Sequence, residues 1–290
     1  MKTKRRLLLQ ALAAGSLWAA RPGWAATEFF PREALLKELM EPGRLRVAVY
    51  RDFAPYSVGT QGIDAEIGRL LAQSLGLAAE IVPFTADEDL NDDLRNMVWK
   101  GHYLGTRPAD VMLHVPVDPH LADQNDKVKI CAPYHVERIA VARHPQRVPP
   151  VQGSAAQGLE VFTREKIGVE TASLPDAFLL AVLSGRLREQ VVHFKTVAEA
   201  AQALQRGDIS AVMAPQAEIE AALRGQAQFV IEPVQLGELK TDHWLLGMAV
   251  KAENIVLAAS LEQAVQTLRR NQAIAKVFSQ AGVSYHAPGG

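Results

Sequence analysis

The stretch Leu-Arg-Val-Ala-Val-Tyr at residues 45–50, between Pro42-Gly43 and Pro55, sets the fold class of the chain. A β-branched run between turn residues is typical of a strand. After this run, apolar residues recur at helical spacing over residues 67–75, and Asp64 is the predicted N-cap of that helix. The chain therefore begins as a strand followed by an amphipathic helix.

The alternation of strand and helix continues to the end of the chain. Further strands are predicted at residues 80–84, 110–115, 139–142, 166–169, 191–194, 209–213, 229–232 and 245–250. Helices are predicted at residues 91–99, 175–187, 197–206, 215–223 and 257–268. The order β-α-β implies parallel strands joined by right-handed crossovers, so the sequence predicts an α/β fold. A stretch rich in Pro and Gly at residues 144–158 divides it into two lobes.

The first 25 residues have the three parts of an export signal. A basic start, an apolar segment at residues 7–20 and small residues just before Ala26 predict a leader at residues 1–25. Both the Sec and the twin-arginine routes fit, because Arg5-Arg6 precedes the apolar segment. We therefore expect the mature protein to start at Ala26 and to reside in the periplasm.

Charge and cysteine content exclude several classes of protein. The chain has 31 Lys and Arg, of which five lie in the predicted leader, and this leaves 26 basic residues against 32 Asp and Glu. Nucleic-acid binders usually present a basic face, so we expect no nucleic-acid partner. Cys131 is the only cysteine, which excludes an intramolecular disulfide framework and every Cys-x-x-Cys motif. We expect it to be a small buried apolar residue.

The residues after the first strand carry a family resemblance. Residues 52–57 read Asp-Phe-Ala-Pro-Tyr-Ser, and Gly-Ile-Asp follows at residues 62–64. Ala-Asp-Val-Met at residues 109–112, Ala-Pro-Tyr at 132–134 and Gly-Met-Ala-Val-Lys at 247–251 follow in order. In this order the motifs resemble the periplasmic family 3 solute-binding proteins.

The resemblance implies a two-lobed periplasmic-binding-protein fold of type II, with a hinge and an interdomain cleft. It places lobe 1 at residues 28–142 plus 248–285, lobe 2 at 143–247 and a frayed tail at 286–290. The implied protein is a monomer that captures a small solute for an inner-membrane transporter. Strand ends meet at the cleft of such folds. The ligand-binding residues expected there are Asp52, Phe53, Tyr56, His114, Tyr134, Glu170, Thr171 and Ser173.

The charge anchors of an amino-acid site are not found in this sequence. The family's amino-acid receptors use an arginine after the third strand for the α-carboxylate and an aspartate on lobe 2 for the ammonium. Here no arginine follows Met112 before Arg138, and the aspartate position falls on Ala214. A generic amino acid is therefore not the expected ligand. Tyr56 and His114 would carry binding instead, and their loss would leave folding stability nearly unchanged.

A narrower resemblance keeps a second function open. Residues 92–105 and the stretch Asp-Val-Met-Leu-His-Val-Pro at 110–116 resemble proteins encoded beside periplasmic quinoprotein alcohol dehydrogenases. These include the J proteins of methanol-dehydrogenase clusters. For such an accessory protein, the cleft would bind a segment of the dehydrogenase during its maturation or activation.

No catalytic or cofactor motif is present. The chain lacks the Gly-x-Ser-x-Gly, Gly-x-Gly-x-x-Gly, P-loop and His-Glu-x-x-His patterns. Asp87, Asp89 and Asn91 begin a calcium-loop pattern, which fails because Asp92 and Val98 occupy its glycine and glutamate positions. We interpret this stretch as an acidic helix N-terminus. The expected protein is therefore not an enzyme and holds neither a cofactor nor a metal ion.

Overall fold

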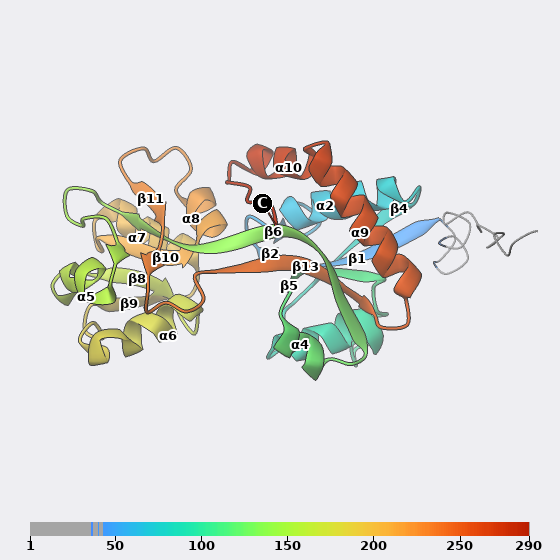
Figure 1. Ribbon diagram of the computed structural model, residues 1–290, viewed down its shortest axis with the longest axis horizontal. Coiled ribbons are helices and arrows are strands. Elements are labelled where there is room, and N and C mark those ends of the chain that lie inside the picture. The colour runs from blue at the N-terminus through green and yellow to red at the C-terminus, as the bar shows by residue number, and fades with distance from the viewer. Residues whose placement is uncertain (1–35, 37–39, 41–42, 290) are drawn as a thin grey trace, which may run out of the picture.

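The computed structural model describes residues 36, 40 and 43–289, which fold into two α/β lobes (Figure 1). The predicted leader and the predicted mature N-terminus at Ala26 lie outside the described residues. Within the described part, no helix has the length and apolarity needed to cross a membrane. Lobe 2 is inserted between two long strands, β6 (Val128–Arg143) and β13 (His243–Lys251), and the chain then returns to lobe 1.

Lobe 1 is built on a mixed sheet with the strand order β4-β1-β5-β13-β6. β1 is parallel to β4 and β5, and β13 is antiparallel to β5 and β6. The first three strands are β1 (Arg44–Tyr50), β4 (Ala78–Phe84) and β5 (Val111–Pro116). A short hairpin, β2 (Asp52–Phe53) with β3 (Ser57–Val58), follows β1 directly.

Helices cover both faces of the lobe 1 sheet. One face packs against α2 (Ile63–Ser74), α9 (Ile255–Arg270) and α10 (Ala273–Ala281). The other carries α3 (Leu90–Leu94), a π-helix (Arg95–Trp99) and α4 (Pro119–Gln124). Side chains alternate along a strand, so β1 serves both sides. Val47 and Val49 join the core under α2 and α9, and Ala48 joins the core with Leu94.

Lobe 2 has a smaller sheet with the order β6-β10-β8-β9, and β11 pairs with β6. The strands of lobe 2, inside and outside this sheet, are β7 (Gln152–Gly153), β8 (Ile167–Glu170), β9 (Val191–Phe194), β10 (Ala211–Pro215), β11 (Val230–Pro233) and β12 (Gln235–Leu236). Its helices are α5 (Ala155–Gly158), α6 (Leu174–Ala181), α7 (Val197–Arg206) and α8 (Gln216–Ala222), with 3-10 turns at Glu160–Thr163 and Val182–Gly185. Two apolar cores, one on each side of this sheet, stabilise the lobe.

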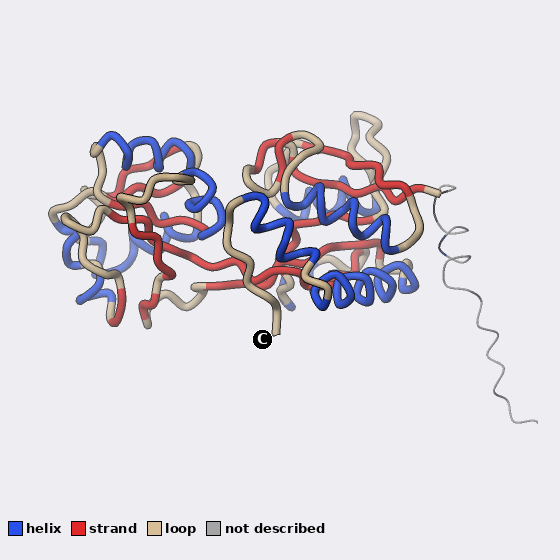
Figure 2. Tube along the Cα trace, turned by 90° about the horizontal axis from the view of Figure 1, so that it is seen from above, coloured by secondary structure: helices blue, strands red, loops and turns tan. Residues whose placement is uncertain are grey.

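Two strands connect the lobes, as Figure 2 shows from above. β6 pairs with β13 in lobe 1 and continues into lobe 2, where it pairs with β10. At the crossing, Arg138 lies opposite His243, and the Ile139 amide donates to the carbonyl of Asp242 at 2.8 Å. The chain thus crosses at residues 138–139 and 242–243. Two adjacent strands allow the lobes to rotate about this line, which is the geometry of a hinge.

Two local expectations from the sequence are wrong. Asp64 does not cap α2, because Gly62 holds that position and Asp64 is buried in the first turn. The predicted helix at 175–187 ends early, because Leu183 and Ser184 adopt left-handed backbone angles that no α-helix accommodates. At the start of the expected tail, the carbonyl of His286 accepts from the Val136 amide at 2.9 Å, so this residue is attached to β6.

His135 also links that C-terminal segment to β6. Its ring is 1% exposed and lies 4.3 Å from the ring of Phe278, centroid to centroid. Burial, assisted by the neighbouring His286, lowers the pKa of His135 to about 3. An unfolded chain binds a proton to histidine near pH 6.5, so acidification between these values favours the unfolded state.

We expect His135→Gln to flatten the pH dependence of stability. In the wild type, this one histidine makes the free energy of unfolding fall by up to about 1.4 kcal/mol for each pH unit below about 6. Urea unfolding at several pH values between 7 and 4 measures the slope. His120→Gln, on the exposed side of α4, is the control and should retain the wild-type slope. Equal slopes in both variants would show that His135 is not held neutral by the fold.

Candidate functional site

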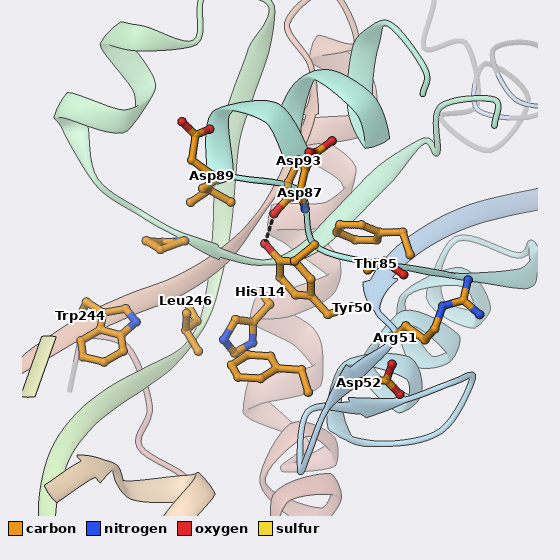
Figure 3. Close-up of a pocket in the computed structure, with 15 residues that line it drawn as sticks. Tyr50, Arg51, Asp52, Thr85, Asp87, Asp89, Asp93, His114, Trp244 and Leu246 are labelled. Carbon is orange, nitrogen blue, oxygen red and sulfur yellow. Dashed lines mark hydrogen bonds between the residues drawn. The ribbon is translucent and has the colours of Figure 1, made fainter. Parts of the chain in front are cut away.

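A cavity of about 610 Å³ lies at the edge of lobe 1 that faces the interlobe region (Figure 3). It is formed where β1 and β4 end, beside the start of α3 and opposite the first residues of β13. Carboxyl ends of neighbouring parallel strands leave such crevices in open α/β sheets. The lining residues are Tyr50, Arg51, Asp52, Phe53, Phe84, Thr85, Ala86, Asp87, Asp89, Leu90, Asp93, His114, Pro116, Trp244 and Leu246.

One wall of the cavity consists of aromatic rings. Tyr50 lies 4.7 Å from Phe84 and 5.9 Å from Phe53 between ring centroids, and it meets Phe53 edge to face. Phe53 also meets the ring of His114 edge to face at 4.8 Å. Such edge-to-face contacts hold rings rigidly. Trp244 of β13 lies on the side of the cavity away from Arg51 (Figure 3).

A second wall carries carboxylates from the β4–α3 connection. Asp89 caps α3 by accepting the Asp92 amide at 2.9 Å. Asp93 accepts the Tyr50 hydroxyl and the Asp87 amide, each at 2.8 Å. Burial raises the pKa of Asp93; these two hydrogen bonds oppose the shift, and the charges of Asp87 and Asp89 add to it. The negative charges therefore repel one another at the cavity surface.

A buried polar network lies beneath the aromatic wall. Asp64, which is 0% exposed, accepts the Tyr134 hydroxyl at 2.7 Å and lies 3.2 Å from Nδ1 of His114. Next to it, the Tyr56 hydroxyl donates to Glu137 of β6. Burial raises the pKa of Glu137 and of both tyrosines. These groups connect the floor of the cavity to the strand that crosses between the lobes.

The backbone at His114 turns the ring toward this network. His114 lies in β5 yet has a φ of 63°, in the left-handed region that side chains other than glycine rarely adopt. The cost of that conformation is offset by the Asp64 contact and by the neighbouring rings of Phe53 and Tyr56, at 4.8 and 4.2 Å. His114 is therefore held in one orientation at the cavity wall.

Lobe 2 contributes a separate group of carboxyls. Glu170 ends β8, and Glu218 lies in the first turn of α8. Burial raises the pKa of both groups, and the charges of Glu170 and Glu137 raise that of Glu218 further. Glu218 thus lies within electrostatic range of both Glu170 and Glu137.

The structure separates the residues expected at the site into three sets. Asp52, Phe53 and His114 line the cavity together. Tyr56 and Tyr134 are 1% and 0% exposed and lie beneath it. The lobe 2 residues do not line it: Glu170 is half-buried at a strand end, the Thr171 hydroxyl donates to the Phe194 carbonyl, and Ser173 caps α6. Whether these eight residues bind a ligand stays a prediction.

The expected position of a lobe 2 anchor is also corrected. Ala214 is 1% exposed and faces the core between α7 and α8, so no side chain at this position reaches the interlobe region. The absence of an aspartate at position 214 therefore does not show whether the cleft is charged. Carboxyls are present at other positions, in Glu170 and Glu218 on lobe 2 and along the β4–α3 connection of lobe 1.

Sequence reasoning missed several lining residues. The side chains of Tyr50 and Phe84 end neighbouring parallel strands, and this position is a signal that could have assigned them. From the sequence, the stretch that begins at Asp87 is interpreted as an acidic helix N-terminus, and no role is assigned to Asp93. Trp244 reaches the cavity through the late strand β13, and no local pattern indicates that. Cys131 is buried as expected, and burial raises the pKa of its thiol to about 12.

Among the described residues, no group of three or more His, Cys, Asp or Glu side chains has an arrangement that could hold a metal ion. Asp87 and Asp89 of the calcium-loop pattern are each hydrogen-bonded to nearby backbone or amide groups.

Comparison with known proteins gives the fold class. Neither a family model nor a curated protein sequence matches this chain. Among solved structures, it is similar to an ancestral cationic amino acid solute-binding protein, with a TM-score of 0.66 and 19% identity over 86% of this chain and 99% of that one. An amino acid transporter substrate-binding protein from Streptococcus pneumoniae, bound to L-arginine, gives 0.59 and 18% over 88% and 99%.

A solute receptor for L-cysteine from Neisseria gonorrhoeae is also similar, with a TM-score of 0.55 and 19% identity over 86% of this chain and 92% of that one. At these identities the likeness shows the fold alone. The chain has the two-lobed fold of these binding proteins, as the resemblance implied. None of these three proteins is described as a partner of a quinoprotein dehydrogenase.

Proposed function

We propose that this protein is a receptor that captures a small solute in the cavity of lobe 1 and closes lobe 2 over it. The observation that carries the proposal is the cavity itself. It lies at the carboxyl ends of β1 and β4, beside the two strands that join the lobes. Its volume of about 610 Å³ falls within the range of about 300–1,000 Å³ that is typical of small-molecule sites. Similar folds in the comparisons are solute-binding proteins.

We also propose where the protein resides and which partner it serves. The leader predicted at residues 1–25 would export the chain to the periplasm through the Sec or the twin-arginine route. There, a monomer would deliver its solute to an inner-membrane transporter. Hinge closure supplies the signal, because it creates a surface from both lobes that exists only in the closed state.

The solute is proposed not to be a generic amino acid. An α-carboxylate needs a cationic partner when it is desolvated. Arg51 is the one Lys or Arg among the lining residues, and its guanidinium donates to the Pro83 carbonyl at 3.2 Å and points away from Trp244 (Figure 3). A carboxylate inside the cavity would instead face Asp87, Asp89 and Asp93.

The alternative is an accessory protein that binds a segment of a periplasmic quinoprotein alcohol dehydrogenase. One observation favours it. The loop after the π-helix exposes Tyr103 by 87% and Leu104 by 75%, and His102 of this loop lies 4.0 Å from Asp87 of the cavity wall. Exposed apolar side chains beside a cavity suit contact with another protein. A screen for solutes separates the two functions.

We propose binding rather than catalysis. The buried carboxyl of Glu137 already accepts hydrogen bonds from Tyr56 and from the Arg138 amide. It is also absent from the lining residues, so it cannot transfer a proton to a solute there. One similar structure is described as an ancestral precursor of cyclohexadienyl dehydratase, with a TM-score of 0.57 and 19% identity. Loss of substrate over time in the binding assays would indicate catalysis.

A solute screen tests the receptor function. Trp99 and Trp244 are the tryptophans after the predicted leader, so a Trp99→Phe variant makes Trp244 the only fluorescent reporter at the cavity. We expect at least one compound of a metabolite library to change this emission with 1:1 saturation. The same compound should raise the thermal midpoint, because ligands that bind only the folded state stabilise it. A library without such a compound, together with capture of a purified quinoprotein dehydrogenase, would favour the accessory function.

A further inference from the structure

We infer that the solute is an organic cation, an amine or a quaternary ammonium on an apolar body, and that it lacks a carboxylate. This inference rests on the proposed function and deepens it by naming the chemical class of the solute. Three features of the cavity carry it: an excess of carboxylates over basic groups, aromatic surface beside those carboxylates, and the position of the one arginine.

The charge of the lining is strongly negative. Asp52, Asp87, Asp89 and Asp93 contribute four carboxylates, against the guanidinium of Arg51 and the imidazole of His114, which lies 3.2 Å from the buried Asp64. The hydrogen bonds that hold Asp87, Asp89 and Asp93 come from neutral donors: backbone amides, the Tyr50 hydroxyl and the Asn96 amide. Such donors orient a carboxylate without cancelling its charge. A cation placed between these groups would relieve their mutual repulsion.

The aromatic wall gives the same cation a second partner. Tyr50 bridges the two walls, since its ring packs on Phe53 and Phe84 while its hydroxyl binds Asp93. Ring faces attract ammonium and guanidinium groups through their quadrupoles, and they also cover apolar surface. Carboxylates alone would not define a site. Here they lie on one side of a cavity whose other side is aromatic.

The charge of the lining also decides against a carboxylate on the solute, because Asp52, Asp87, Asp89 and Asp93 all lie at this one cavity. The aspartates of the lining would attract the ammonium of a zwitterion but repel its carboxylate. They would only attract an amine that lacks a carboxylate, and this difference in affinity predicts selection against amino acids.

A series of indole compounds tests the inference at constant body shape. Tryptamine is a cation, N-acetyltryptamine is neutral, indole-3-acetate is an anion and tryptophan is a zwitterion. Titration calorimetry at low salt should give tryptamine the highest affinity, at least tenfold above each of the others. Added salt should weaken tryptamine binding but leave that of the neutral compound nearly constant.

Variants that remove carboxylate charges show which residues attract the cation. Asp89→Asn keeps the cap of α3, because asparagine caps helices as well as aspartate does. The double variant Asp87→Asn with Asp89→Asn should lose about tenfold in affinity for tryptamine, about 1.4 kcal/mol, and should bind N-acetyltryptamine as the wild type does. Asp126→Asn, which removes an exposed charge near Lys127, is the matched control and should change neither affinity.

The outcomes separate this inference from the proposed function. Equal or tighter binding of N-acetyltryptamine, indole-3-acetate or tryptophan overturns the cation assignment and leaves the receptor function standing. Loss of tryptamine binding in Asp126→Asn equal to that in the double variant also overturns it. If all four compounds fail to bind, the cation assignment is overturned. The receptor function falls as well if the metabolite library also contains no ligand.

Discussion

Replacing Tyr56 by alanine is expected to lower the free energy of unfolding by about 3–5 kcal/mol, as for other large aromatic side chains removed from a core. The ring is 1% exposed and lies 4.2 Å from the ring of His114 and 5.5 Å from that of Phe53. Its hydroxyl donates to Glu137, which the substitution would leave buried without this donor. This result would correct the expectation from the sequence that Tyr56 serves binding alone.

Two further variants make the Tyr56 experiment decisive. Tyr56→Phe keeps the ring and removes only the donor to Glu137, so we expect a smaller loss of about 1–3 kcal/mol. Tyr103→Ala removes a tyrosine that is 87% exposed and should stay within about 0.5 kcal/mol of the wild type. Urea unfolding at neutral pH measures all three. A loss in Tyr56→Ala no greater than that in Tyr103→Ala would show that Tyr56 is not part of the core.

Phe53→Ala is expected to weaken binding of the best solute from the screen by at least about thirtyfold, which corresponds to about 2 kcal/mol. Phe53 is half-buried, lines the cavity, and packs against both Tyr50 and His114, so its loss removes contact area and loosens the aromatic wall. Fluorescence of Trp244 gives the dissociation constant of each variant.

The neighbouring strand of the same hairpin offers the control. Val58 is 56% exposed, lies opposite Asp52 in the β2–β3 pair and does not line the cavity. Val58→Ala should bind the solute as the wild type does. Equal weakening in both variants would attribute the effect to the hairpin as a whole, and an unchanged affinity in Phe53→Ala would place the solute elsewhere.

Local signals predicted much of the fold. β1 was expected from a β-branched run between turn residues, and the structure places it at Arg44–Tyr50. The helix at residues 197–206 was also expected; in the structure the Thr196 hydroxyl accepts the Glu199 amide at its start, and Gly207 adopts the left-handed C-cap conformation at its end. Both elements depend on contacts between residues that are close in sequence, which a sequence displays directly.

The crossing strand β6 was not predicted at its full length. Only residues 139–142 were expected, whereas the strand covers Val128–Arg143. Its first part contains Pro133, which cannot donate to a ladder, and Ala132, which has a φ of 50°. Pairing with β13, far along the chain, stabilises this irregular part. Propensity over a few residues carries no information about such a partner.

The dependence on partners far along the chain also explains which site residues could be predicted. Asp52 and Phe53 follow β1, His114 lies two residues before the end of β5, and strand ends meet at one edge of a parallel sheet. Trp244 comes from an antiparallel strand that returns from lobe 2, so its position depends on the register of β13 against β6. The role of Asp87 and Asp93 depends on the rings opposite them. Their charge was visible in the sequence, and the cavity that they face was not.

A crystal structure of the protein with the tightest-binding compound of the screen is the decisive measurement, because it places the solute. We expect electron density for the compound between the aromatic wall of Tyr50 and Phe53 and the ring of Trp244, with its cationic group toward Asp87, Asp89 and Asp93. We also expect lobe 2 to be rotated toward lobe 1 about the crossing at residues 138–139 and 242–243. Density for the compound outside this cavity, in crystals whose protein still binds it 1:1 in solution, would contradict the proposed site.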